Sequence, residues 1–149
     1  MPAAQDEPVP RDTPGAEHGP RHEAREHAVA LLYEAEMKKS SLDDVMAAQA
    51  VTPDGYTVAL VTGVAAEGDR VDTLVSEAAV GWELDRMPVV DRTILRLATW
   101  ELLARPDVPT AVILDEAVEL AKQYSTEQSG GFVNGVLATI AAQVRPAPA

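Results

Sequence analysis

The fold of this chain is decided by the sequence VVDRTILRLATWELL, residues 89–103. Its apolar side chains go round most of a helix instead of following one face, so we expect a buried, central helix. A turn at residues 106–109 follows, and then two further helical patterns, one opened by Pro109 and one that includes residues 132–144. Three closely joined helices, two of them apolar on more than one side, belong inside a helical domain.

Four earlier segments also space their apolar residues by three and four, the period of an amphipathic helix. In the segment at residues 53–68, Thr52 is the expected N-cap and Pro53 the first helical residue. No segment has a convincing strand pattern, so the sequence predicts an all-α fold of about seven helices. The four segments are residues 22–37, 42–50, 53–68 and 69–79.

The two ends of the chain differ in composition from the rest. Residues 1–20 contain five of the eleven prolines and almost no large apolar residues, so we expect this tail to be disordered. Residues 145–149 are expected to form a second, frayed end. The connector at residues 82–87 is the expected boundary between an N-terminal helical subdomain, residues 21–81, and a C-terminal one, residues 82–144.

The start of the last helix has two interpretations. Residues 125–128, Ser-Thr-Glu-Gln, have the pattern of a capping box, which would begin the helix there. The pair Gly130-Gly131 would weaken a helix that continues through it, so a short turn with a restart at Ser129 is equally consistent with the sequence.

The composition limits the classes of function. The formal net charge is −12 and the pI about 4.5, and a protein this acidic is a poor nonspecific binder of nucleic acid. The chain has no cysteine, no apolar run of membrane length and no signal-peptide core, so we expect a cytoplasmic protein without membrane contact. His18, His22 and His27 lack metal-binding spacing, and no nucleophile with a base or phosphate-binding loop is present. We therefore expect no enzyme activity, no metal and no cofactor.

Three basic residues at the start of the first helix are a candidate anion site. Arg21, His22 and Arg25 lie where cations oppose the helix dipole, and Arg21 and Arg25 are four residues apart on one face. Together with the unpaired amides of the helix start, they could bind a phosphate. The alternative is that Arg25 pairs with acidic groups while Arg21 ends the tail.

Two further groups of residues have competing interpretations. Phe132, next to the flexible Gly130-Gly131 pair, could stack on an unpaired base, although its spacing favours a place in the core. Four polar residues interrupt otherwise apolar helices, and we expect them to form an internal network that ties the C-terminal helices together. These four are Arg96, Glu101, Glu116 and Asn134.

Several of these blocks together resemble the NusB family of bacterial transcription antitermination factors. The resemblance covers about residues 21–141; the C-terminal blocks are very specific in order and spacing, and residues 40–80 resemble the family least. The blocks that carry it are Ala24-Arg25-Glu26, Leu32-Tyr33, Asp91-Arg92, Ile94-Leu95-Arg96, Trp100-Glu101-Leu102, Asp107-Val108-Pro109, residues 116–122 (EAVELAK) and residues 132–137 (FVNGVL).

The resemblance implies a fold of two small helical bundles that share the first helix. It also implies binding to the boxA element of ribosomal RNA operon transcripts, together with NusE, a ribosomal protein of the small subunit, in an assembly that helps RNA polymerase read through terminators. The RNA surface of the family maps here to Arg21, His22 and Arg25 and to the region from Gln128 to Phe132. Asp91 falls at a position of the surface that faces NusE.

The chain departs from the family pattern at two places, and each departure removes positive charge from the implied RNA surface. Glu23 stands where a cation is common, and Gly130-Gly131 replace a segment that often carries a lysine or arginine. Our hypothesis is that the protein binds boxA-type RNA weakly alone and needs the basic charge of NusE. Some family members self-associate, and the sequence leaves open whether this chain forms a homodimer.

Two other functions compete with this one. A NusB-like fold also serves as the RNA-binding module of a ribosomal RNA methyltransferase. A purely helical interaction protein without RNA contact is the other alternative, and it would bind NusE without any gain in RNA affinity.

Overall fold

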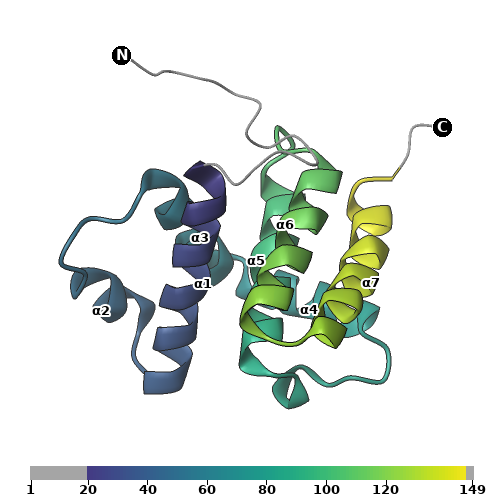
Figure 1. Ribbon diagram of the computed structural model, residues 1–149, viewed down its shortest axis with the longest axis horizontal. Coiled ribbons are helices and arrows are strands. Elements are labelled where there is room, and N and C mark those ends of the chain that lie inside the picture. The colour runs from purple at the N-terminus through teal and green to yellow at the C-terminus, as the bar shows by residue number, and fades with distance from the viewer. Residues whose placement is uncertain (1–19, 147–149) are drawn as a thin grey trace.

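The computed structural model describes residues 20–146, and within them the fold is all-α, as predicted, with seven α-helices, a short 3-10 helix and no strand (Figure 1). Of the predicted tail at residues 1–20, residues 1–19 lie outside the described residues, as do residues 147–149, and Pro20 is the first residue of α1. The elements are α1 Pro20–Lys38, α2 Leu42–Ala47, α3 Gly55–Ala66, α4 Gly68–Ala78, η2 Leu84–Arg86, α5 Val89–Ala104, α6 Thr110–Tyr124 and α7 Glu127–Val144.

The helices form two groups joined through α1 and α5. The helices α2 and α3 pack on α1, and α4, α6 and α7 pack on α5, while α1 and α3 also contact α5 (Figure 1). The predicted boundary at residue 81 assigns α4 to the N-terminal group. In the structure α4 packs mainly on α5 and α7, so the division between the groups falls between α3 and α4. One hydrophobic core runs through both groups.

Helix α5 is the central element, as its all-round apolar pattern predicts. Eleven of its residues are buried, among them Ile94, Leu95 and Leu97. Because α5 contacts α1, α3, α4, α6 and α7, every one of these helices buries part of its apolar face on it. No helix among residues 20–146 combines the length and the hydropathy that crossing a membrane requires.

Helix α3 approaches α5 closely because Gly63 has no side chain. A Cβ atom at Gly63 would overlap the indole ring of Trp100, which lies against the backbone of α3 at this point. Gly63 lies in the middle of a helix, where glycine is unfavourable by roughly 0.5–1 kcal/mol relative to alanine. The cost is offset by the burial of Trp100, which is 9% exposed.

The start of α3 differs from the prediction, whereas α7 starts within the predicted capping-box segment, residues 125–128. The N-cap of α3 is Asp54, whose carboxylate accepts from the Tyr56 backbone N–H at 2.9 Å, so the predicted start at Thr52 and Pro53 is wrong. The carboxylate of Asp54 satisfies a free amide of the first turn, as an N-cap must.

At α7 the N-cap is Thr126, whose hydroxyl accepts from the Ser129 backbone N–H at 3.0 Å. The helix continues through Gly130 and Gly131 without a restart. Gly130 is buried against the side chain of Lys122, where a Cβ would lie 3.0 Å from the Lys122 Cγ. The close approach of α6 therefore explains a glycine here.

Arg145, which was predicted to begin a frayed end, is bound to the body of the protein. Its guanidinium donates to the backbone carbonyls of Glu101, Leu102 and Arg105 at the end of α5, and to the Val108 carbonyl and the Thr110 hydroxyl, at 2.7–3.2 Å. The last carbonyls of a helix lack partners within the helix, and a cation there also complements the helix dipole.

Replacing Gly63 with alanine is expected to lower the free energy of unfolding by about 1–3 kcal/mol, because the clash with Trp100 outweighs the gain in helix propensity. Gly135→Ala in α7 is the matched control, since a Cβ there meets nothing within 4 Å. It should raise the free energy of unfolding by about 0.5–1 kcal/mol. Urea denaturation followed by circular dichroism measures both, and equal stability of the two variants would contradict the close packing of α3 on Trp100.

Replacing Arg145 with alanine is expected to cost about 2 kcal/mol of stability, since hydrogen bonds from a charged group contribute roughly 1.5–3 kcal/mol and the exposed carbonyls regain some water. Arg70→Ala, on an exposed position of α4, is the control and should change the free energy of unfolding by less than about 0.5 kcal/mol. A thermal melt of Arg145→Ala that matches this control would show that the end of the chain does not cap α5.

Candidate nucleic-acid interface

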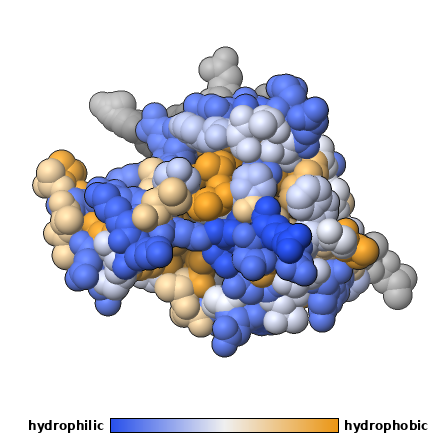
Figure 2. Space-filling model, turned by 90° about the horizontal axis from the view of Figure 1, so that it is seen from below, coloured by the Kyte–Doolittle hydropathy of each residue, from blue (hydrophilic) through white to orange (hydrophobic). Residues whose placement is uncertain are grey.

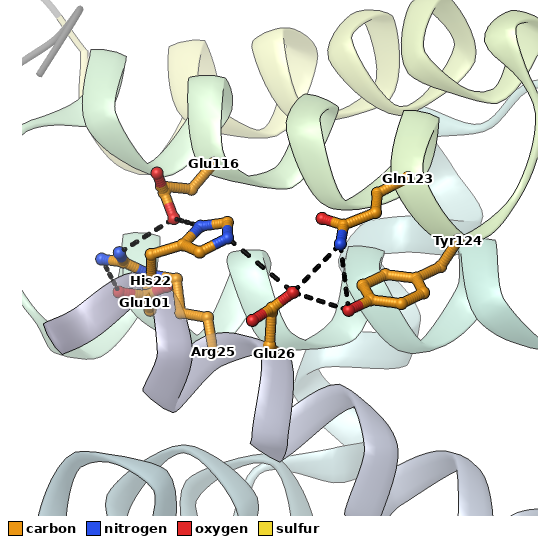
Figure 3. A network of polar contacts seen from close by, with 7 residues as sticks. All are labelled: His22, Arg25, Glu26, Glu101, Glu116, Gln123 and Tyr124. Atoms are coloured by element: carbon orange, nitrogen blue, oxygen red, sulfur yellow. Dashed lines mark hydrogen bonds and ion pairs between the residues drawn. The ribbon is translucent and has the colours of Figure 1, made fainter. Parts of the chain in front are cut away.

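A buried ion pair holds the start of α1 against α5 (Figure 3). The Arg25 Nε donates to Glu101 Oε1 and the Arg25 Nη2 to Glu101 Oε2, both at 2.9 Å. Each side chain is only 1% exposed. Two parallel N–H···O bonds between a guanidinium and a carboxylate give the pair a fixed geometry as well as a favourable energy. Arg25 is therefore committed to the interior.

His22, Glu116 and Tyr56 extend this ion pair. The His22 Nδ1 lies 2.7 Å from Glu116 Oε1, and that same oxygen is 3.5 Å from Arg25 Nη1. The Tyr56 hydroxyl donates to Glu101 Oε2 at 2.5 Å. Burial, together with the charge and hydrogen bond of Glu101, raises the pKa of Tyr56 well above its usual value. One network thus joins α1, α3, α5 and α6.

A second branch of the network reaches the end of α6 (Figure 3). The Tyr124 hydroxyl donates to Glu26 Oε2 at 2.6 Å, and the Gln123 side-chain amide donates to the same oxygen at 3.2 Å. The hydrogen bond to Glu26 raises the pKa of Tyr124. The same Glu26 oxygen, Oε2, also lies 3.9 Å from the Nε2 of His22.

The three residues of the predicted anion site differ in exposure and in their partners. His22 is 5% exposed and turned toward Glu116, and Arg25 is paired with Glu101, which matches the alternative that Arg25 binds acidic groups. Arg21 remains at the surface, with a side chain 35% exposed. His22 and Arg25 thus fix the position of the first turn of α1, and the charged side chain of Arg21 lies at the surface beside this turn.

Arg21 is joined by a second arginine that the sequence did not indicate. The guanidinium carbons of Arg21 and Arg105 lie 4.6 and 4.8 Å from the centre of the Tyr56 ring. Asp107 binds Arg105 through both carboxylate oxygens, at 3.1 and 2.9 Å, and lies 3.9 Å from Arg21. The hydrogen bond from Arg105 lowers the pKa of Asp107 to about 2. No periodic pattern marks Arg105, because it follows the end of α5.

The start of α7 forms the second candidate surface, and here the structure brings predicted residues together. Asp91, Gln128 and Phe132 line one pocket of about 340 Å³. Gln128 is exposed, Phe132 half-buried and Asp91 buried. Figure 2 shows this end of the molecule, where hydrophobic areas lie between strongly hydrophilic ones. The full lining is Trp82, Arg86, Pro88, Asp91, Thr126, Gln128, Ser129 and Phe132.

Trp82 was placed in a connector and given no role by the sequence, yet it forms a wall of this pocket. Its ring centre lies 5.6 Å from that of Phe132, with the two planes inclined by 60°. The Trp82 side chain is unusually open for a tryptophan, at 54% exposure. Two accessible aromatic rings beside a polar helix start can stack on unpaired bases.

Asp91 links the start of α5 to the start of α7. The Ser129 hydroxyl donates to Asp91 Oδ2 at 2.8 Å, and the backbone N–H of Ser129 is bound by the cap residue Thr126. The other oxygen, Oδ1, is buried and has no hydrogen-bond partner within residues 20–146. Most buried polar atoms have a partner, so this oxygen is an exception that requires an explanation.

The four residues of the predicted internal network divide into three places. Glu101 and Glu116 meet through Arg25, so they tie α1 to α5 and α6 instead of tying the C-terminal helices to one another. Arg96 binds Asp72 of α4 at 2.7 and 3.1 Å and lies 3.6 Å from Glu36 of α1. Asn134 lies apart, on the exposed side of α7.

The two candidate surfaces lie at different ends of the helices. Helix α1 starts at the end where α5 finishes, and α7 starts at the end where α5 begins (Figure 1). The first surface offers guanidinium groups and the second offers aromatic rings with polar groups. Residues 20–146 contain no group of three or more metal-ligating side chains.

Comparison with known proteins identifies the same family that the sequence blocks resemble. The NusB family model matches residues 22–142. NusB of T. maritima is 37% identical, with 84% of this chain and 92% of that chain covered and a TM-score of 0.77. In a structure of the antitermination factors NusB and NusE in complex with dsRNA, the matching chain is 25% identical, with 83% of this chain and 96% of that chain covered and a TM-score of 0.68. NusB from Aquifex aeolicus is 27% identical, with 87% of this chain and 93% of that chain covered and a TM-score of 0.67.

Replacing Arg25 with methionine is expected to lower the free energy of unfolding by about 3–5 kcal/mol, because it leaves the Glu101 carboxylate buried without its partner. The double variant Arg25→Met with Glu101→Leu should recover most of that loss, since an apolar pair of similar size removes both charges. Lys38→Met is the control: it breaks an exposed pair with Glu34 and should cost less than about 0.5 kcal/mol. Denaturant titrations in which the double variant is less stable than Arg25→Met would contradict this account.

Proposed function

Because the chain belongs to the NusB family, we propose that it is a transcription antitermination factor that binds boxA-type RNA of ribosomal RNA operon transcripts together with NusE. The observation that carries the proposal is the family match over residues 22–142, with 37% identity to a NusB over most of both chains. The similar structure in which NusB and NusE bind dsRNA supports an RNA and a protein partner of this kind.

In this proposal, two surfaces contact the RNA in different ways. Arg21, supported by the Tyr56 ring beside Arg105, binds phosphate at the start of α1. Gln128 and Phe132 contact bases at the start of α7, where Phe132 offers a partly open ring. His22 and Arg25, which were predicted as RNA contacts, act instead as the buried support that holds Arg21 in place.

NusE supplies the charge that this chain lacks. With a formal net charge of −12, the protein repels a polyanion at long range, and Glu23 and Gly130-Gly131 take the places of cations common in the family. The NusE surface lies on the C-terminal half of the chain. Asp91 is only 3% exposed, so a partner reaches it only through the pocket at the start of α7.

The role we propose is not catalytic. The protein acts within the transcription elongation complex by holding RNA and NusE together, so that RNA polymerase reads through terminators. A homodimer that covers the RNA surface would be inactive, and dilution would convert it into active monomers. An RNA-binding module of the methyltransferase type, or a helical interaction protein, is the alternative that the following experiment separates from this role.

The test is fluorescence anisotropy of a labelled boxA RNA and of a scrambled control, with this protein alone, with NusE alone and with both. Specific binding is expected only when both proteins are present. Arg21→Gln should then weaken binding to both RNAs and lower the slope of log affinity against log salt by roughly one, because one phosphate contact is lost. Arg70→Gln, on an exposed position of α4, is the matched control and should leave both quantities unchanged.

The proposal fails if adding this protein to NusE leaves the affinity for boxA RNA unchanged. Binding of NusE without that gain would support the interaction protein. Tight, specific RNA binding by the protein alone at physiological salt would contradict the dependence on NusE.

A further inference from the structure

One carboxylate oxygen of Asp107 lies between two arginines beside the start of α1. Asp107 Oδ2 accepts from Arg105 Nη2 at 2.9 Å, and the same oxygen lies 3.9 Å from Arg21 Nη2. Asp107 Oδ1 accepts from Arg105 Nε at 3.1 Å, which completes a two-bond contact between carboxylate and guanidinium. The two guanidinium groups therefore converge on one anionic oxygen. Arginine uses the same donor geometry for carboxylates and for phosphates, so a phosphate fits the place that Asp107 occupies.

Arg105 does not depend on Asp107 for its position. Its guanidinium carbon lies 4.8 Å from the centre of the Tyr56 ring, where the attraction between a cation and an aromatic face holds it. The Tyr56 ring is itself fixed by the hydrogen bond from its hydroxyl to Glu101. The backbone carbonyl of Arg105 accepts from Arg145 Nη2 at 2.7 Å. Arg105 would therefore keep its place if the carboxylate moved away.

Asp107 is the member of this group that can leave. Its side chain is 53% exposed, so water can solvate the carboxylate once the bonds to Arg105 break, whereas the carboxylate of Glu101 is buried. Asp107 also lies in the turn between α5 and α6 and not within a helix. Protonation does not release Arg105 near neutral pH, because the hydrogen bond from Arg105 lowers the pKa of Asp107 to about 2. A competing anion can release it.

We propose that Arg105 is a second phosphate-binding residue beside Arg21, and that the carboxylate of Asp107 occupies the phosphate position until an RNA phosphate displaces it. The displaced carboxylate turns to water, and the phosphate oxygens accept from both guanidinium groups. This assignment deepens the phosphate contact proposed above and rests on it for RNA as the source of the phosphate. Asp107 is then an internal competitor, which weakens RNA binding by the cost of breaking its own contact with Arg105.

The first test is fluorescence anisotropy of labelled boxA RNA with NusE and the whole protein, at several salt concentrations. Asp107→Asn should bind about two- to fivefold more tightly, the factor that an exposed ion pair contributes. Its slope of log affinity against log salt should be steeper by up to about one, because no carboxylate is released to the solvent when the phosphate binds. Arg105→Gln should weaken binding, and in the double variant the gain from Asp107→Asn should disappear.

Two controls separate displacement from a general loss of negative charge and from a loss of structure. Asp43→Asn removes one charge at an exposed position of α2, outside both candidate surfaces, and should raise the affinity by less than about twofold. The melting temperature of Asp107→Asn should change by no more than a few degrees, because an exposed ion pair contributes little to stability.

An affinity of Asp107→Asn no higher than that of Asp43→Asn would overturn the proposal. A gain that persists in the double variant with Arg105→Gln would also overturn it, because Asp107 would then act through its charge alone and not by occupying Arg105.

Titration with inorganic phosphate at constant ionic strength, without RNA or NusE, separates this proposal from the antitermination role. The Nε–Hε signal of Arg105 in NMR spectra should shift, with half-saturation about two- to fivefold lower for Asp107→Asn than for the unchanged protein. No shift, or equal half-saturation in the two proteins, would contradict the competition.

The two proposals fail in different ways. If boxA RNA binds with NusE, and Asp107→Asn binds it only as tightly as the unchanged protein, the antitermination role stands and the competition by Asp107 is wrong. If boxA RNA does not bind even with NusE, the antitermination role is wrong, while the phosphate titration still decides whether Asp107 competes for Arg105.

Discussion

The rest of the structure depends on the buried pair of Arg25 and Glu101. Neither charge can be left alone in the interior, since an isolated buried ion costs several kcal/mol. Helix α1 therefore has one register against α5, the one in which the guanidinium and the carboxylate meet with two bonds. That register places Arg21 on the Tyr56 ring beside Arg105, and it places Glu26 next to the end of α6. An apolar contact would tolerate sliding of α1, whereas this pair does not.

Helix α5 connects this network to the pocket at the start of α7. Asp91 lies in its first turn and Glu101 in its last, ten residues apart, which is about 15 Å along the helix axis. Between them, α5 is packed on several helices, including α3, whose Gly63 allows Trp100 to lie against the backbone. A fully packed helix thus holds two chemically different surfaces at a fixed separation.

The helices and their central member could be predicted from the sequence because period and composition are local properties. The start of α3 could not, because Asp54 and Thr52 are both good caps and only the packed structure selects one. The burial of His22 and Arg25 depended on Glu101 and Glu116, acids more than 70 residues away along the chain, so the three cations looked like one surface patch. Trp82 and Arg105 were missed for a related reason: both lie between helices, where no periodicity indicates the direction of a side chain, and only the fold brings them to their aromatic partners.

The distribution of charge supports the proposal that this protein needs a basic partner to hold RNA. Within residues 20–146, Arg21 lies 3.9 Å from Asp107 and Arg86 lies 3.7 Å from Glu83. Other arginines are bound more closely by carboxylates or carbonyls of the protein: Arg25 by Glu101, Arg92 by Glu36, Arg96 by Asp72, Arg105 by Asp107, and Arg145 by the end of α5. Phosphate binding requires cations that can give up their present contacts, and each of these would leave an acid or a helix end without its partner. At the start of α7 the candidate interface offers the rings of Trp82 and Phe132, the Gln128 amide and one exposed arginine, Arg86. Aromatic and amide groups can contact bases but attract a polyanion only weakly, so in the proposed function the long-range attraction would come from NusE.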